Sequence, residues 1–155
     1  MCTFLFGVIR MNEYMDMAFL EAENAFKENE VPVGAVLVYD NQIVFKSHNS
    51  KEFNNCVLNH AEINVIEGYS KIINNWRLDE CELYITKDPC PMCASAIKQA
   101  RISKVFSAVE TDSENTDIIN RIFNSDDSNK KVIFVTNLDV KRGKKILSDF
   151  FKNKR

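Results

Sequence analysis

Two short motifs place the strongest constraint on the fold, because they carry residue types that bind metal ions. The first is His60-Ala61-Glu62, and the second is Pro89-Cys90-Pro91-Met92-Cys93. Imidazole and thiolate groups are the ligands that zinc favours in a tetrahedral shell. A fold that uses both motifs must therefore bring two segments that are distant in the sequence to one point.

The spacing of the second motif places both thiols on one side of a helix. Pro91 is favourable at the first helical position, and Cys90 and Cys93 are three residues apart, so both sulfurs face the same way. The partial positive charge of a helix N-terminus also stabilises thiolates. Together with His60, these ligands leave a fourth position for water, which is the pattern of catalytic rather than structural zinc.

Glu62 lies two residues after the predicted histidine ligand, within reach of a zinc-bound water. Zinc lowers the pKa of bound water from about 15.7 to about 7, and a neighbouring carboxylate can move protons as general acid and base. A lone Cys-x-x-Cys also occurs in redox pairs and zinc ribbons, but this sequence has no second one. The combined motifs are typical of zinc-dependent deaminases, in which attack on a ring carbon releases ammonia.

The composition fits one folded domain over residues 1–155. Hydrophobic residues make up 45% and charged residues 27%, and a chain of 155 residues can bury a core without disulfides. The five cysteines are an odd set, and Cys56 is expected to be a small buried thiol rather than a fourth ligand. The apolar start lacks signal-peptide features and is too short to span a bilayer, so we predict a cytoplasmic protein.

Charge is unevenly distributed along the chain. The net charge is −2, yet residues 141–155 contain seven basic residues against one acid, Asp149. Such asymmetry marks either the solvated face of a helix, which is the commoner case, or a contact with a polyanion such as RNA. Charge alone leaves both interpretations open.

The order of the periodic segments predicts a layered α/β domain with a mixed sheet. Met11 begins the helical pattern, so residues 1–10 are expected to be a loose extension or a misassigned start. Glu110–Asp117 reads as a polar stretch and Ile118–Phe123 as a short apolar patch. The predicted elements are a helix Glu13–Asn29, strands Val33–Tyr39 and Gln42–Lys46 joined by an Asp40-Asn41 turn, a helix from His60 to Asn74 capped by Asn59, a strand Glu82–Thr86, a helix from Pro91 to Ala100, strands Lys104–Val109 and Lys131–Thr136, and a helix Asp139–Lys152.

Several segments outside the metal motifs carry a family resemblance. They are Glu30-Val31-Pro32-Val33-Gly34-Ala35-Val36, Leu83-Tyr84-Ile85-Thr86, Arg101-Ile102 and Ser148-Asp149-Phe150-Phe151. With these segments the chain resembles the bacterial tRNA-specific adenosine deaminases of the cytidine-deaminase-like superfamily over nearly everything after Met11. The resemblance implies a three-layer α/β/α domain with a five-stranded mixed sheet flanked by helices, one zinc ion per subunit and a homodimer. It also implies conversion of adenosine to inosine at the wobble position, A34, of tRNA.

The resemblance also implies roles for individual residues. His60, Cys90 and Cys93 would hold the metal, and Glu62 would move protons. Asn49 and the backbone around Ala61 would hold the nucleoside, with Val33 and Pro89 near the pocket wall. The C-terminal helix would meet the phosphates and bases of the anticodon stem-loop through Lys144, Lys145, Phe150, Phe151 and Lys152.

Three segments depart from the family pattern. Cys56-Val57-Leu58-Asn59 stands where the family has Asp-Pro-Thr-Ala, and Lys87-Asp88 replaces Leu-Glu. Glu110–Asp117 lacks glycine and holds four acids, which would repel phosphate. Two alternatives therefore stay open: a small-molecule deaminase acting on guanine, cytosine or a similar base or nucleoside, and a non-catalytic zinc-bearing subunit or RNA-binding module. Phe53, which lies between Asn49 and His60, is expected either to stack on a base or to pack.

Overall fold

The computed structural model describes the backbone of residues 2–127 and 129–154, and the side chains of residues 4–127 and 129–154. Five strands form one sheet, in the order β2-β1-β3-β4-β5. β1 runs antiparallel to both β2 and β3, whereas β3, β4 and β5 run parallel, so the predicted five-stranded mixed sheet is confirmed. The strands are β1 (Gly34–Tyr39), β2 (Gln42–His48), β3 (Glu82–Ile85), β4 (Lys104–Ser107) and β5 (Ile133–Val135).

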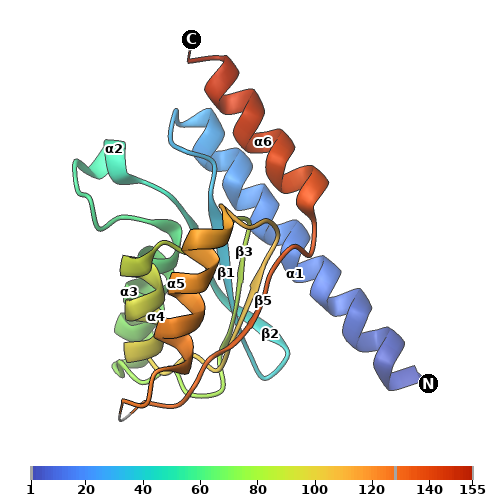
Figure 1. Ribbon diagram of the computed structural model, residues 1–155, viewed down its shortest axis with the longest axis vertical. Helices are drawn as coiled ribbons and strands as arrows, with labels where there is room; N and C mark the ends of the chain where they lie inside the picture. Colours follow the sequence, from blue (N-terminus) through green and yellow to red (C-terminus); the bar gives the residue numbers. More distant parts are fainter. Residues whose placement is uncertain (1, 128, 155) are drawn as a thin grey trace.

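Helices cover both faces of the sheet and give three layers (Figure 1). α1 (Cys2–Lys27) and α6 (Val140–Lys152) lie side by side on one face. The other face carries α3 (Ala61–Ile73), α4 (Pro91–Gln99) and α5 (Ser113–Asn124), and the short α2 (Lys51–Asn54) lies in the loop between β2 and α3. The three-layer α/β/α architecture is therefore confirmed.

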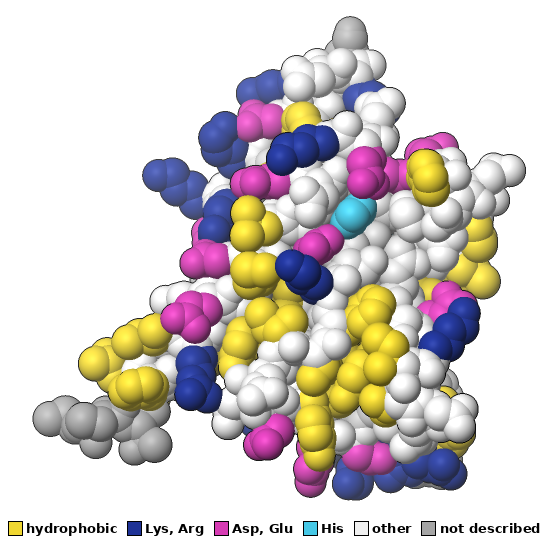
Figure 2. Space-filling model, turned by 180° about the vertical axis from the view of Figure 1, so that it is seen from behind, with side chains coloured by type: hydrophobic (Ala, Val, Ile, Leu, Met, Phe, Trp, Pro, Cys, Tyr) yellow, Lys and Arg dark blue, Asp and Glu magenta, His cyan; other side chains and the backbone are white. Residues whose placement is uncertain are grey.

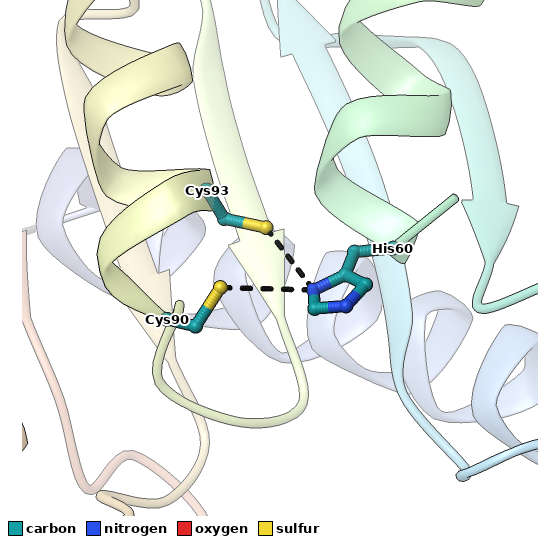
Figure 3. A group of neighbouring side chains, drawn as sticks. All are labelled: His60, Cys90 and Cys93. Carbon is teal, nitrogen blue, oxygen red and sulfur yellow. Dashed lines mark hydrogen bonds between the residues drawn. The ribbon is translucent and has the colours of Figure 1, made fainter. Parts of the chain in front are cut away.

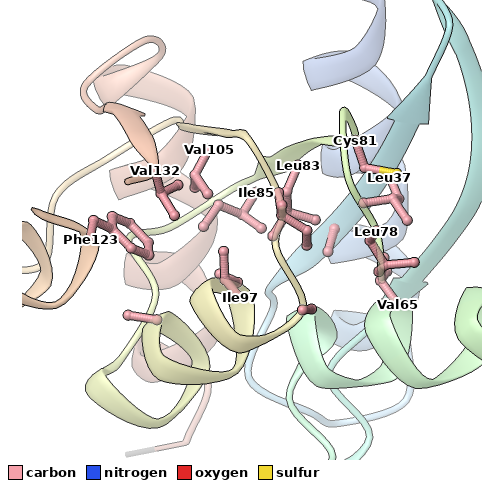
Figure 4. Packing of buried hydrophobic residues seen from close by; sticks show 14 of the residues in the cluster. Leu37, Val65, Leu78, Cys81, Leu83, Ile85, Ile97, Val105, Phe123 and Val132 are labelled. Carbon is pink, nitrogen blue, oxygen red and sulfur yellow. The ribbon is translucent and has the colours of Figure 1, made fainter. Parts of the chain in front are cut away.

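Each face of the sheet has its own apolar core, because alternate strand residues point in opposite directions. Leu37, Leu83 and Ile85 pack against Val65 of α3 and Ile97 of α4 in the core shown in Figure 4. On the opposite face, the buried strand residues Val36, Val38 and Tyr84 pack with Tyr14, Met15, Ala18 and Phe19 of α1. Burial on both faces explains why β1 is a nearly continuous apolar run.

The β1–β2 connection is the predicted two-residue turn. Asp40 and Asn41 have positive φ angles of 49° and 60°, which is the backbone conformation of a type I′ hairpin turn. Asp and Asn tolerate this region better than other side chains. Tyr39 and Gln42 pair directly across the turn, which fixes the register of the hairpin.

Gly34 allows α1 to lie directly on the first strand. A Cβ atom at this position would lie 1.9 Å from the carbonyl oxygen of Ala18 and 2.6 Å from the backbone nitrogen of Ala22. No side chain fits in that space without moving the helix backbone. The segment that follows α1 leads straight into the site described below, so this contact also sets the position of the site.

The structure corrects the expectation of a loose extension for residues 2–10, whereas Met1 lies outside the described residues. From Cys2 onward the backbone is helical and continuous with the rest of α1, and no proline interrupts this segment. The first turns project beyond the sheet and expose Phe4, Leu5 and Phe6 (Figures 1 and 2). Within the described residues, no helix combines the length and apolar character needed to cross a membrane.

Two short stretches without a predicted element are helical. α5 begins inside the polar stretch, and the Asp112 side chain caps it by accepting from the backbone nitrogen of Asn115 at 2.8 Å. Ile119 and Phe123 bury its inner face. The other unpredicted helix is the single turn α2. The predicted cap of α3 is also wrong by one residue, because His60 rather than Asn59 precedes its first helical residue.

Candidate active site

The N-termini of α3 and α4 face each other and bring together the three predicted metal ligands (Figure 3). His60 immediately precedes α3, and Cys90 immediately precedes α4. His60 Nδ1 lies 3.7 Å from Cys90 Sγ and 3.4 Å from Cys93 Sγ. The two motifs, which are distant in the sequence, therefore converge on one point.

These separations fit a tetrahedral zinc shell. With Zn–S bonds of about 2.3 Å and a Zn–N bond of about 2.1 Å, tetrahedral angles place nitrogen and sulfur about 3.6 Å apart. The two measured distances lie on either side of that value, and all three ligand atoms are within 4.8 Å of one another. Cys56, considered as a fourth ligand, lies outside this cluster and is half-buried.

The electrostatics at the helix ends favour a thiolate. A hydrogen bond with the Cys93 thiol lowers the pKa of Cys90 to about 5, and the same bond raises the pKa of Cys93. Both thiols also lie at the N-terminus of α4, where the helix dipole favours negative charge. Since metal ligands must be deprotonated, this setting suits a cation.

Glu62 occupies the first turn of α3, beside these donors. Its side chain is only 3% exposed, and burial raises its pKa above the usual value. The carboxyl group lines a cavity of about 210 Å³ together with two of the ligand residues. That volume is below the range of about 300–1,000 Å³ that is usual for drug-sized ligands, so the cavity suits a single base. Its lining residues are Val31, Val33, Asn49, Lys51, His60, Ala61, Glu62, Lys87, Asp88 and Cys90.

Three of the four predicted substrate-binding residues line this cavity: Asn49, Ala61 and Val33. Pro89 is outside the lining and is buried, and its carbonyl oxygen accepts a hydrogen bond from Asn115 Nδ2 at 3.3 Å. Pro89 therefore connects the cysteine motif to α5, and it lies between two residues that line the cavity, Asp88 and Cys90.

The sequence reasoning missed the role of Glu30. This carboxylate is 1% exposed and accepts hydrogen bonds from the backbone nitrogens of Phe53 at 2.7 Å and Glu52 at 3.2 Å. It also accepts from Asn49 Nδ2 at 3.3 Å, which orients the amide toward one side of the cavity. One indication of this role was visible in the sequence, because Glu30 is an acid directly before the apolar Val31-Pro32-Val33 segment.

The predicted RNA-contacting residues of α6 differ in exposure. Lys144, Lys145 and Lys152 are exposed, and Lys145 pairs with Asp149 at 2.6 Å. Figure 2 shows basic side chains interleaved with acids along this edge. Phe151 is 51% exposed, but Phe150 is 5% exposed and packs against Phe26, so its ring does not present a face to a base. Arg155, the last residue of the basic run, lies outside the described residues.

The end of α6 lies near the cavity. A groove of about 390 Å³ is lined by Phe150, Phe151 and Lys154 and also by Val31, which lines the cavity as well. Glu52 of α2 lines the groove, and its neighbour Lys51 lines the cavity. The two hollows are therefore adjacent across the segment around Val31 and α2. Phe53 itself is 83% exposed, so it does not pack.

A family model described as MafB19-like deaminase matches residues 9–155. The chain belongs to the MafB19-like deaminase family. It is 35% identical over 143 residues to a tRNA-specific adenosine deaminase of Aquifex aeolicus, covering 92% of this chain and 94% of that protein. A tRNA-specific adenosine deaminase of Bacillus subtilis is 44% identical over 92 residues, and this match spans 59% of the chain and 57% of that relative.

One solved structure supports the same placement within the deaminases. It comes from a study of A-to-I editing by tRNA:A34 deaminases at the wobble position of transfer RNA. Its TM-score is 0.80 at 32% identity, and the match covers 88% of this chain and 99% of that chain. The three-layer fold of this chain therefore closely resembles that of the solved structure.

Proposed function

We propose that this protein hydrolytically deaminates adenosine to inosine at the wobble position, A34, of tRNA. One observation carries the proposal: a buried carboxyl group, Glu62, lines one base-sized cavity together with two residues, His60 and Cys90, of a zinc-type donor set. The chain around this cavity is similar over 92% of its length to a protein named tRNA-specific adenosine deaminase. A cytoplasmic location remains our prediction, because the substrate is tRNA.

The reaction exchanges the amino group on C6 of the base for oxygen from water and releases ammonia. His60, Cys90 and Cys93 would hold a zinc ion, which supplies a Lewis acid that lowers the pKa of water from about 15.7 to about 7. Glu62 takes a proton from the attacking water and delivers it to the ring nitrogen. A second transfer through the same carboxyl group protonates the leaving amine.

The remaining lining residues position the base. Asn49 donates a hydrogen bond to Glu30, so its amide is fixed before the substrate binds. A side chain that is already fixed loses less conformational entropy on binding. The backbone at Ala61 lies at the N-terminus of α3, where N–H groups are free to donate. Val33 supplies an apolar wall. Burial of the base in this cavity requires its extrusion from the anticodon loop.

Two partners belong to the same proposal. The exposed groups of α6, namely Lys144, Lys145, Lys152 and Phe151, would contact the anticodon stem-loop. A homodimer follows from the family resemblance, and the exposed apolar side chains of Val57 and Leu58, which precede His60 in the chain, offer it a surface. Light scattering of the purified zinc-loaded protein measures this state directly.

The test uses an unmodified tRNA transcript that carries A34. We expect inosine at that position, and we expect Glu62→Gln to lower kcat by about 10²–10⁴ with zinc content unchanged. Glu67→Gln is the matched control, since it lies on the same helix but is exposed and pairs with Lys71. Equal activity of the two variants would exclude the proton-transfer role of Glu62.

The same experiment separates the alternatives. Ammonia release from guanine, cytosine or their nucleosides, with no inosine in tRNA, would identify a small-molecule deaminase. RNA binding without any turnover would identify a non-catalytic module. Both results would overturn the proposed function.

A further inference from the structure

Two lysines, Lys51 and Lys87, line the same cavity as Glu62. Both side chains are half-buried. The lysine ion pairs in the described part of the chain all involve other lysines. Partly buried ammonium groups without a carboxylate partner favour an anionic ligand, because the ligand offsets the lost hydration.

The backbone that carries Lys51 is held in place. The next two residues, Glu52 and Phe53, donate their backbone N–H groups to the buried Glu30 carboxylate. The carbonyl oxygen of Lys51 accepts from the backbone nitrogen of Cys56 at 3.1 Å, which closes the turn. Lys51 therefore projects from a fixed segment beside the cavity rather than from a free loop.

The backbone around Lys87 is held on both sides. Thr86 is buried, and it exchanges two hydrogen bonds of 3.1 Å with Gly34, one through its backbone nitrogen and one through its hydroxyl. The backbone nitrogen of Asp88 donates to Val109 at 2.9 Å. The Asp88 carboxylate accepts from the hydroxyls of Thr116 and Thr136, so its oxygens are occupied by neutral donors.

The two cations come from separate segments and share the cavity with two helix N-termini, those of α3 and α4. These helix ends add partial positive charge. A nucleotide within a strand carries a phosphate on each side of its sugar, whereas a free base carries none. We propose that Lys51 and Lys87 bind the phosphates that flank the deaminated nucleotide. This inference rests on the proposed function and names two residues that would hold the RNA strand on either side of the deaminated nucleotide.

The test compares Lys51→Gln and Lys87→Gln with the control Lys71→Gln. Lys71 lies on α3, is exposed and pairs with Glu67. On an anticodon stem-loop RNA, we expect each cavity variant to raise KM about fivefold, with kcat changed by less than about twofold. The dependence of log(kcat/KM) on log salt should become shallower by about 0.7 for each lysine. Variants that match Lys71→Gln in KM and in salt dependence would overturn the inference.

A second RNA distinguishes phosphate contact from a role in folding. Replacing the linkages on both sides of A34 by uncharged methylphosphonates should raise the wild-type KM. It should also abolish the difference between wild type and the lysine variants. Lys87→Arg keeps the charge and should retain the wild-type KM on ordinary RNA. A lysine effect that persists on the neutral RNA would assign these residues to structure instead.

Failure of the proposed function gives a different result. In that case wild type makes no inosine from RNA, whatever the lysine variants do. The inference is then tested on the best small substrate, as a nucleoside and as its 5′-monophosphate. A lower KM for the monophosphate that depends on the lysines retains the phosphate site, and equal KM values overturn it.

Discussion

Replacing Glu30 by Gln tests whether one buried carboxylate holds the segment that forms one side of the cavity. Three donors converge on Glu30: the backbone nitrogens of Glu52 and Phe53, and the Asn49 amide. Gln has nearly the same volume, but it keeps only one acceptor oxygen and presents an amide that is itself a donor. At least one of the two backbone N–H groups must therefore lose its acceptor.

The size of the effect follows from this geometry. A hydrogen bond to a charged group contributes about 1.5–3 kcal/mol, and a buried donor without a partner costs a similar amount. Because Glu30 is 1% exposed, solvent does not screen the loss. We expect Glu30→Gln to lower the free energy of unfolding by about 2–3 kcal/mol. We also expect a higher KM for RNA, since both Asn49 and Lys51 depend on this anchor.

Urea unfolding of the zinc-loaded protein measures the first effect, and steady-state kinetics on the stem-loop RNA measures the second. Zinc content should not change, because the hydrogen bonds that Glu30 accepts come from none of the proposed ligands. Glu67→Gln is the control and should change the free energy of unfolding by less than about 0.5 kcal/mol, as for other exposed pairs. If Glu30→Gln matched this control in both stability and KM, the anchoring role would be refuted.

Three further predictions follow from other contacts. Cys90→Ala should lose bound zinc and stability, since metal binding is coupled to folding; full occupancy by metal analysis would contradict the ligand assignment. Gly34→Ala should lower the free energy of unfolding by about 1–3 kcal/mol, because its Cβ would lie 1.9 Å from the Ala18 carbonyl oxygen. Gly7 lies in α1, where a Cβ atom would meet nothing within 4 Å, so Gly7→Ala should raise the free energy of unfolding by about 0.5–1 kcal/mol. Equal responses of the two variants in urea unfolding would exclude the close approach of α1 to Gly34. Burial lowers the pKa of His48, but hydrogen bonds to two glutamates outweigh it and leave the pKa raised above 6.5. The stabilisation from the protonated ring is therefore complete below about pH 6.5 and lost as pH rises through the folded pKa. His48→Gln should flatten that part of the stability–pH curve, and an unchanged curve would show that the ion pairs contribute nothing.

The sequence predicted those elements whose signals are local. The Asp40-Asn41 turn needs only two residues that tolerate positive φ, and both adopt it. The helix after Cys90 starts where Pro91 permits it. The mixed sheet was predictable because the expected strands alternate with helices along the chain, and the number of five strands came from the family resemblance. Each of these features depends on neighbours in the chain.

The missed features depend on tertiary contacts. α5 has a polar first turn, so its apolar pattern begins only near Ile119, and the signal was too short for a helix. Glu30 is recognisable as an anchor only when the chain returns to place Phe53 beside it. Lys87 differed from the family pattern in the sequence and Lys51 did not stand out, but only the fold shows that both line one cavity. The spacing of His60, Cys90 and Cys93 in the sequence predicted the metal site, but it could not show which other residues would surround it.

The acidic segment Glu110–Asp117 shows how the fold changes the meaning of a local charge count. Four acids predicted repulsion of phosphate, yet none of them is among the residues that line the cavity. Asp112 caps α5, and Glu114 lies in its first turn, where negative charge stabilises the helix. Two neutral side chains of the same turn support the segment that leads into α4, because Asn115 donates to the Pro89 carbonyl and Thr116 donates to Asp88. The segment therefore stabilises the backbone that carries Lys87, and the charged side chains that a substrate meets at the cavity are not these acids but Lys51, Lys87, Glu62 and Asp88.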